Sequence, residues 1–362
     1  MPENKSHHYV PQMYMRLFSD EDEKCVGVFA LEKKKFIPSA PIKGQACKNY
    51  FYGKDGKAEK SFGKIETRVR SILREIIDNT NLPANGSEEY EFLMLYLALQ
   101  HCRTTDAEAE HMEAAEKTVK SMLHRKATLE GNQIILDALP NVRIKRTNAI
   151  SETVRVATVG ASLLTDLNLM LLKNETDKAF ISSDVPVVLH NRIYEDQTEF
   201  SATGFASVGL QVFLPLGPRY MLVCYDPGVY RADKVVHLTD LHAVNLLNEL
   251  QWEAANKVLL VSPETTENEL YERAANFTFE KEKERTIFRE EVMSENDGEL
   301  RTRHGSGAKP SSVLLDLPFI SVIVARPDKV APFEHPPIRD ELKMAKVEAA
   351  FNLMTEFESE IL

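Results

Sequence analysis

The sequence predicts an α+β fold in which a helical N-terminal half packs on a sheet-rich C-terminal half. Apolar residues recur at helical spacing over about residues 1–175, whereas short β-like runs dominate about residues 176–275. Hydrophobic residues make up 43% of the 362 residues. A chain of this length and composition can bury a full core without disulfides or a structural metal.

Helices are expected over residues 11–18, 62–78, 87–102, 106–126 and 151–172. Pro11 suits the first turn of the first helix. In the second helix Ile65, Val69 and Ile72 fall on one stripe, which indicates an amphipathic surface helix. The third helix, preceded by Ser87 as a partial cap, is apolar nearly all round and should therefore lie at the centre of the core.

Strands are expected over residues 24–31, 34–39, 179–182, 185–189, 208–214, 220–225 and 258–261, the first two as a hairpin. A helix capped by Asp240 is expected over 240–255, directly before the strand over 258–261. This unit resembles a strand–helix–strand crossover. The chain should close with a strand at about 319–325 and a helix over 339–362.

Three segments follow from these elements. Residues 1–275 should form one α+β unit, and residues 313–362 a strand and a helix that dock on the same body. Between them, residues 276–312 are rich in Glu, Lys, Arg, Gly and Ser and lack an apolar stripe. We expect a charged, flexible excursion there.

Composition restricts the class of protein. The net charge of −11 disfavours general coating of nucleic acid, although a local basic groove remains compatible with it. The longest apolar run, 92–99, is too short to span a membrane, and no signal-like segment is seen at the start. Four cysteines without a CxxC spacing (Cys25, Cys47, Cys102 and Cys224) fit a reducing compartment. The expectation is a cytoplasmic protein without a membrane segment.

The string His7-His8-Tyr9-Val10-Pro11-Gln12 is dense in groups that bind ligands or exchange protons. Two adjacent histidines in the turn before a helix can approach one ligand from two sides. The alternative is structural, with His8 and Gln12 satisfying local backbone groups. The residue pattern leaves both interpretations open.

The opening HHYVPQMYMRLFS resembles the first motif of a bacterial family named domain of unknown function 4238. Three later stretches resemble further motifs of that family: QHCRT at 100–104, ISSDVPVV at 181–188 and LPLGPR at 214–219, with weaker matches at Asn248 and Gln251. Met13 and Met15 stand where the family more usually has an aromatic residue and a leucine, a change that keeps apolar volume. The resemblance covers about residues 7–261 and implies a fold family without an inherited activity.

Gln100 and Arg103 lie three residues apart, so they share one face of a largely apolar helix. A guanidinium buried there needs a carboxylate, a ligand anion or several carbonyls. Asp184, in a Ser183-Asp184 turn closed by Pro186, is the expected partner. The pair could hold the helical and sheet parts together or belong to a catalytic site, and Ser183 with Asp184 could equally be ordinary turn residues.

Two functional hypotheses follow from these residues. In the first, the protein is a phosphodiester-cleaving effector of a defence or toxin system. His7, His8 and Asp184 are its catalytic groups, acting as acid or base or holding a divalent metal ion, and Gln12, Gln100, Arg103 and Ser183 bind the substrate. In the second, the same cluster belongs to a non-catalytic sensor that binds a small anionic ligand. Phosphate-binding, dinucleotide-binding and HExxH motifs are absent from the sequence.

Overall fold

The computed structural model describes residues 5–20, 22–144, 149–197, 201–280, 284–296, 299–326, 328 and 336–361. The helices are α1 (Gln12–Met15), α2 (Lys57–Asn79), α3 (Glu88–Cys102), α4 (Thr105–Leu129), α5 (Gln133–Ala138), α6 (Ala149–Gly160), α7 (Leu241–Ala254), α8 (Glu267–Ala275) and α9 (Glu341–Ile361). The strands up to the chain's midpoint are β1 (Ser6–His8), β2 (Cys25–Ala30), β3 (Lys35–Pro41), β4 (Cys47–Asn49) and β5 (Asn168–Asn174). The later strands are β6 (Ser182–Ser183), β7 (Val188–His190), β8 (Gln211–Pro215), β9 (Tyr220–Tyr225), β10 (Tyr230–Arg231), β11 (Val235–Leu238), β12 (Val258–Val261), β13 (Thr286–Asn296), β14 (Glu299–Ala308) and β15 (Ser321–Val322).

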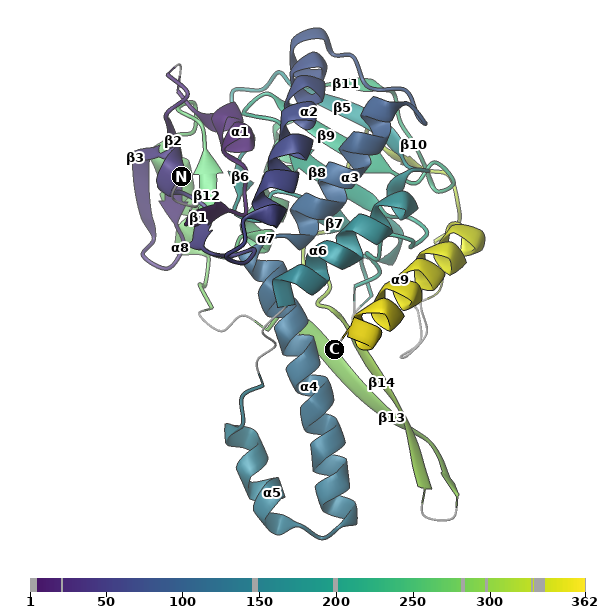
Figure 1. Ribbon diagram of the computed structural model, residues 1–362. Helices are drawn as coiled ribbons and strands as arrows, with labels where there is room; N and C mark the ends of the chain where they lie inside the picture. The colour runs from purple at the N-terminus through teal and green to yellow at the C-terminus, as the bar shows by residue number, and fades with distance from the viewer. Residues whose placement is uncertain are drawn as a thin grey trace.

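A five-stranded sheet in the order β11-β5-β9-β8-β7 forms the centre of the molecule. Helices α2, α3 and α6 cover the face that is turned to the viewer in Figure 1. Successive residues of β5 point to opposite faces: Leu169 and Leu171 pack toward these helices, whereas Met170 and Leu172 pack into a second core that contains α7 residues such as Leu247. The sheet is therefore buried on both faces, and the fold class is α+β, as predicted.

A second sheet, in the order β3-β2-β12-β6, joins the two ends of the family-like region. Strand β2 pairs antiparallel with β12, so Val28 lies opposite Leu260. The expectation of a helical N-terminal half needs correction here, because the chain forms four strands before α2 begins at Lys57. The N-terminal hairpin completes a sheet whose other strands come from the C-terminal half.

The helix expected over residues 151–172 is wrong in its second half. Helix α6 ends at Gly160, a 3-10 turn follows over Ala161–Leu164, and the chain then enters β5. A strand buried on both faces has no alternation of apolar and polar residues, so its sequence cannot be distinguished from a buried helix by periodicity. The strand–helix–strand unit also differs from the expected crossover, because α7 connects strands of two different sheets, β11 in the first and β12 in the second.

Strands β13 and β14 form an antiparallel hairpin where the sequence predicted a weakly structured excursion. The hairpin begins beside the middle of α4 and diverges from it toward its tip, and both project from the body on the same side as α5 (Figure 1). Charged side chains hold it to the helix, as Arg125 pairs with Glu290 at 2.7 Å and Lys117 with Glu284 at 3.0 Å. These partners lie far apart in the sequence, which is why the charged composition alone did not predict a strand.

In the part of the chain that the structure describes, no helix is both long and apolar enough to cross a membrane.

Candidate functional site

The N-terminal segment that follows β1 is buried and contacts the other motifs. The main-chain oxygen of Tyr9 accepts a hydrogen bond from Gln100 Nε2 at 3.0 Å. The buried hydroxyl of Tyr14 donates to the main-chain oxygen of Pro215 at 2.7 Å and lies 2.8 Å from Ser182 Oγ. Segments near residues 10, 100, 182 and 215 therefore meet around one stretch of chain.

Gly217 closely approaches this segment. Its φ of +91° lies in the region that favours glycine, and a Cβ at this position would lie 2.7 Å from the main-chain oxygen of Leu17. The backbone conformation and the close approach of Leu17 therefore both require glycine at this position. The LPLGPR turn therefore packs directly on the end of the first motif.

Arg103 follows the last residue of α3, and only 2% of its side chain is exposed. Its Nε donates to Gln100 Oε1 at 3.0 Å, and its Nη1 donates to Glu66 Oε1 on α2 at 2.9 Å. The guanidinium also lies over the ring of Phe62, 5.0 Å from the centroid. Nη2 is buried and has no hydrogen-bond partner among the described residues.

The predicted ion pair between Arg103 and Asp184 is therefore replaced by a pair between Arg103 and Glu66. The carboxylate of Asp184 accepts hydrogen bonds from the main-chain N–H groups of Asn256 at 2.9 Å and Lys257 at 3.0 Å. Burial raises the pKa of Asp184 to about 6, against the opposing effect of these two donors. Asp184 fixes the turn between α7 and β12, and its carboxylate forms no hydrogen bond or ion pair with His8, Gln100 or Arg103 in the described structure.

Ser183 has a similar structural position. Its hydroxyl donates to Gln251 Oε1 at 2.9 Å and accepts from the main-chain N–H of Val185 at 3.1 Å. The amide of Asn248 accepts from Ile181 N and donates to Ala179 O, both at 3.0 Å. These residues tie the chain around β6 to helix α7, and their polar groups are already satisfied by the fold.

His7 is buried, with 2% exposed, and stacks on Tyr52 at a centroid distance of 5.8 Å. Its Nδ1 accepts a hydrogen bond from the main-chain N–H of Tyr52 at 3.2 Å, so in the neutral ring the proton is on Nε2. His8 is half-buried, and its Nε2 lies 3.2 Å from Lys43 O and 3.5 Å from Gln12 Nε2. Burial lowers the pKa of His8, an effect that the nearby Glu66 partly offsets.

Two carboxylates of α2, Glu59 and Glu66, complete this group and were missed in the sequence. Burial raises the pKa of Glu59, and the positive field of His7 and Arg103 partly opposes this shift. Glu59 and Glu66 lie three residues before and four residues after the buried Phe62, so all three share one helical face. That spacing could have identified them, but the helix was predicted to begin at Phe62, which left Glu59 outside it.

We call His7, His8, Glu59, Glu66 and Arg103 the His–Glu–Arg cluster. Of the residues predicted from sequence, His7, His8, Gln12, Gln100 and Arg103 lie in or beside it, whereas Ser183 and Asp184 do not. In the described part of the chain, no three side chains of His, Cys, Asp and Glu are placed so that they could hold a metal ion.

Three arginines surround a hollow beside this cluster. Arg16, Arg70 and Arg74 line it together with Glu23 and the apolar side chains of Met13, Leu17 and Leu73. The hollow begins one turn from Glu66 of the cluster and one turn from Gln12 beside it, because Arg70 follows Glu66 by four residues and Arg16 follows Gln12 by four. Four residues of helix correspond to roughly 6 Å. We call this site the arginine hollow.

Fold and site together define an α+β protein whose motifs gather around a buried N-terminal segment beside a polar cluster. A model of the family described as "Protein of unknown function (DUF4238)" matches residues 6–265, and the chain belongs to this family. No curated protein and no solved structure showed a significant match to the chain.

Proposed function

We propose that the protein is an enzyme that cleaves phosphodiester bonds by acid–base chemistry at the His–Glu–Arg cluster. The observation that carries the proposal is that His8 and Glu59 each interact electrostatically with His7 and Glu66, while burial lowers the pKa of His8 and raises the pKa of Glu59. The lowered pKa of His8 favours the neutral imidazole, which can act as a base, and the raised pKa of Glu59 favours the protonated carboxyl, which can act as an acid.

Each group has a role in this scheme. His8 removes the proton from the attacking hydroxyl, and Glu59 gives a proton to the oxygen that leaves the phosphorus. Arg103 is buried, so it acts through Glu66, whose carboxylate it neutralises and holds in place. Because the pKa of Glu59 is raised and Glu66 is paired with Arg103, the cluster repels a phosphate less than two free carboxylates would.

The arginine hollow supports a substrate with more than one phosphate. Arg70 and Arg74 are exposed, and neither forms an ion pair with another described residue, so both can bind phosphate oxygens. Along α2, Arg70 follows the proposed acid Glu59 by 11 residues, a rise of roughly 16 Å, so the hollow would hold a phosphate other than the one that reacts. A single-stranded RNA or DNA is therefore the proposed substrate class.

The test is incubation of the full chain with single-stranded and double-stranded RNA and DNA, with divalent ions and with a chelator. Cleavage is expected, with a loss of about 100-fold or more in His8→Asn and in Glu59→Gln. His242→Asn, at an exposed position on α7, is the matched control and should retain full activity. Absence of cleavage of every substrate under all these conditions would refute the enzymatic proposal.

A second function is favoured by one observation, namely that Arg103 Nη2 and Tyr96 Oη are both buried without a partner in the described structure. Donors left in this way are satisfied when a ligand binds beside them. The alternative function is therefore recognition of a small anionic ligand without turnover. Saturable binding of a nucleotide or inorganic phosphate with no product, abolished by Arg103→Met in a protein that remains folded, would favour it.

A further inference from the structure

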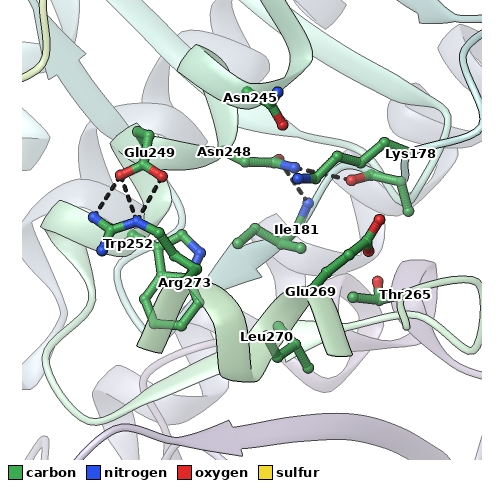
Figure 2. A pocket seen from close by; sticks show the side chains of 11 residues that line it. Lys178, Ile181, Asn245, Asn248, Glu249, Trp252, Thr265, Glu269, Leu270 and Arg273 are labelled. Carbon is green, nitrogen blue, oxygen red and sulfur yellow. Dashed lines mark hydrogen bonds and ion pairs between the residues drawn. The ribbon is translucent and has the colours of Figure 1, made fainter. Parts of the chain in front are cut away.

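A pocket with a volume of about 60 Å³ opens between helices α7 and α8, away from the His–Glu–Arg cluster. It is lined by residues of these helices, by the chain over 178–181 and by Thr265 (Figure 2). Its apolar lining is Ala179, Ile181, Trp252 and Leu270. We call it the α7–α8 pocket.

Some polar groups of this pocket are already used by the fold. Glu249 and Arg273 form a two-pronged ion pair, with Nε–Oε1 at 2.6 Å and Nη2–Oε2 at 2.5 Å. The guanidinium of Arg273 also lies over the ring of Trp252, 5.4 Å from the centroid. The side-chain amide of Asn248 already forms hydrogen bonds with Ile181 N and Ala179 O. None of these groups is left for a ligand.

Four other polar groups face the pocket without a partner among the described residues. Thr265 is only 8% exposed, and its Oγ1 makes no hydrogen bond, nor does the buried Oδ1 of Asn245. The side chains of Lys178 and Glu269 line the same pocket, and they form no ion pair with each other or with another described residue. Figure 2 shows Asn245, Lys178, Glu269 and Thr265 arranged around the open side.

The charges of these groups specify the ligand. Two neutral oxygens and the Glu269 carboxylate accept hydrogen bonds, so they suit an ammonium group. The Lys178 ammonium is a positively charged hydrogen-bond donor, so it suits a carboxylate. A cationic ligand alone would meet repulsion from Lys178, and an anion alone would meet repulsion from Glu269. A zwitterion satisfies both.

We propose that the α7–α8 pocket binds a small zwitterion of the α-amino-acid class, with its ammonium group on Asn245, Thr265 and Glu269 and its carboxylate on Lys178. The size of the pocket agrees with this class. A bound water needs roughly 10–15 Å³ of such space, so the pocket holds only a few heavy atoms, close to the number in glycine or the common core of an α-amino acid. A longer side chain would project through the open side. This site is independent of the proposed phosphodiester chemistry.

The experiment is titration of the full chain with glycine and L-alanine, followed by calorimetry and by NMR shifts of amides near Thr265. Saturable binding is expected, with a dissociation constant on the order of 1 mM. Methylamine and acetate each present one charge of the zwitterion, and each should bind at least about tenfold more weakly. Equal binding of acetate or methylamine, or no saturable binding of either amino acid, would overturn the proposal.

Variants locate the binding. Thr265→Val removes an unpartnered hydroxyl at constant volume, so it should lower affinity about tenfold without affecting folding. Glu269→Gln should do the same, and Glu267→Gln, exposed on the same helix but outside the pocket, should leave affinity unchanged. Binding that is unaffected by both Thr265→Val and Glu269→Gln would contradict the assignment of the ligand to this pocket.

Discussion

Nη1 of Arg103 lies 2.9 Å from Oε1 of Glu66, and this ion pair joins the end of α3 to the middle of α2. The two partners differ in environment, because 2% of the arginine side chain is exposed compared with 25% of the glutamate. Removal of the glutamate therefore leaves a charge in the interior, whereas removal of the arginine leaves a carboxylate that water can reach. The guanidinium depends on the pair more than the carboxylate does.

A double-mutant cycle measures this pair. Glu66→Gln should lower the free energy of unfolding by about 2–3 kcal/mol, since it leaves the buried guanidinium without its counter-ion. Arg103→Met should cost a similar amount through lost hydrogen bonds and packing. The coupling energy between the two changes should exceed about 1 kcal/mol in denaturant melts.

The matched cycle combines Arg103→Met with Asp184→Asn. Asp184 accepts from the main chain of Asn256 and Lys257, so the coupling of these two changes should be below about 0.5 kcal/mol. A larger coupling energy in this cycle than in the Glu66 cycle would support the Arg103–Asp184 ion pair that was expected from the sequence.

Gly217 and Gly53 provide a second comparison. Both have positive φ, +91° and +99°, so an alanine is strained at either position. Only at Gly217 does the new Cβ meet backbone, at 2.7 Å from Leu17 O, since the nearest atom at Gly53 is 3.9 Å away. Gly53→Ala should therefore cost about 1 kcal/mol, and Gly217→Ala at least about 2 kcal/mol more. Equal losses of unfolding free energy for the two variants in a urea melt would show that the backbone at Leu17 moves to accommodate the new methyl group without loss of stability.

The sequence was informative where a local pattern decides the structure. Ser87 caps α3 by accepting from Tyr90 N at 3.2 Å, and β12 runs from Val258 to Val261 as expected. The sequence also showed that a charge at Arg103 needs a partner. It could not select Glu66 over Asp184, because that choice depends on how α2 packs against α3.

Other features are set by contacts between distant parts of the chain. The pairing of β2 with β12 joins residues about 230 positions apart, and no local pattern specifies it. Strand β5 carries apolar residues on both faces, so its buried position removes the alternation that marks a strand. Glu59 was missed for a smaller reason, since helix boundaries are the least certain feature of a sequence pattern.

Asp184 should make stability depend on pH in an identifiable way. Its pKa is raised from 3.8 to about 6 by burial, so the folded state binds its proton more tightly than the unfolded state does. The stabilising effect of that proton is fully present below pH 3.8 and is lost as pH rises through about 6. Asp184→Asn removes this titration and leaves the others in place. The wild-type free energy of unfolding, measured relative to the variant, should fall by about 3 kcal/mol between about pH 4 and pH 7. A difference in unfolding free energy between wild type and Asp184→Asn that does not vary with pH, or that rises with pH, would contradict the raised pKa of the buried Asp184 carboxyl.

The proposed acid and base predict the pH dependence of activity. His8 must be neutral, and burial lowers its pKa below 6.5, so activity should fall on acidification through that lowered pKa. Glu59 must be protonated, and burial raises its pKa above 4.5, so activity should also fall on alkalisation through that raised pKa. The rate of RNA or DNA cleavage should follow a bell with its maximum midway between the lowered pKa of His8 and the raised pKa of Glu59. In Glu59→Gln the residual rate should lose the alkaline limb and keep the acidic one, because only the imidazole still titrates. The control is His242→Asn, whose profile should match that of the wild type. An alkaline limb that persists in Glu59→Gln would remove this carboxyl from the reaction and with it the proposed acid.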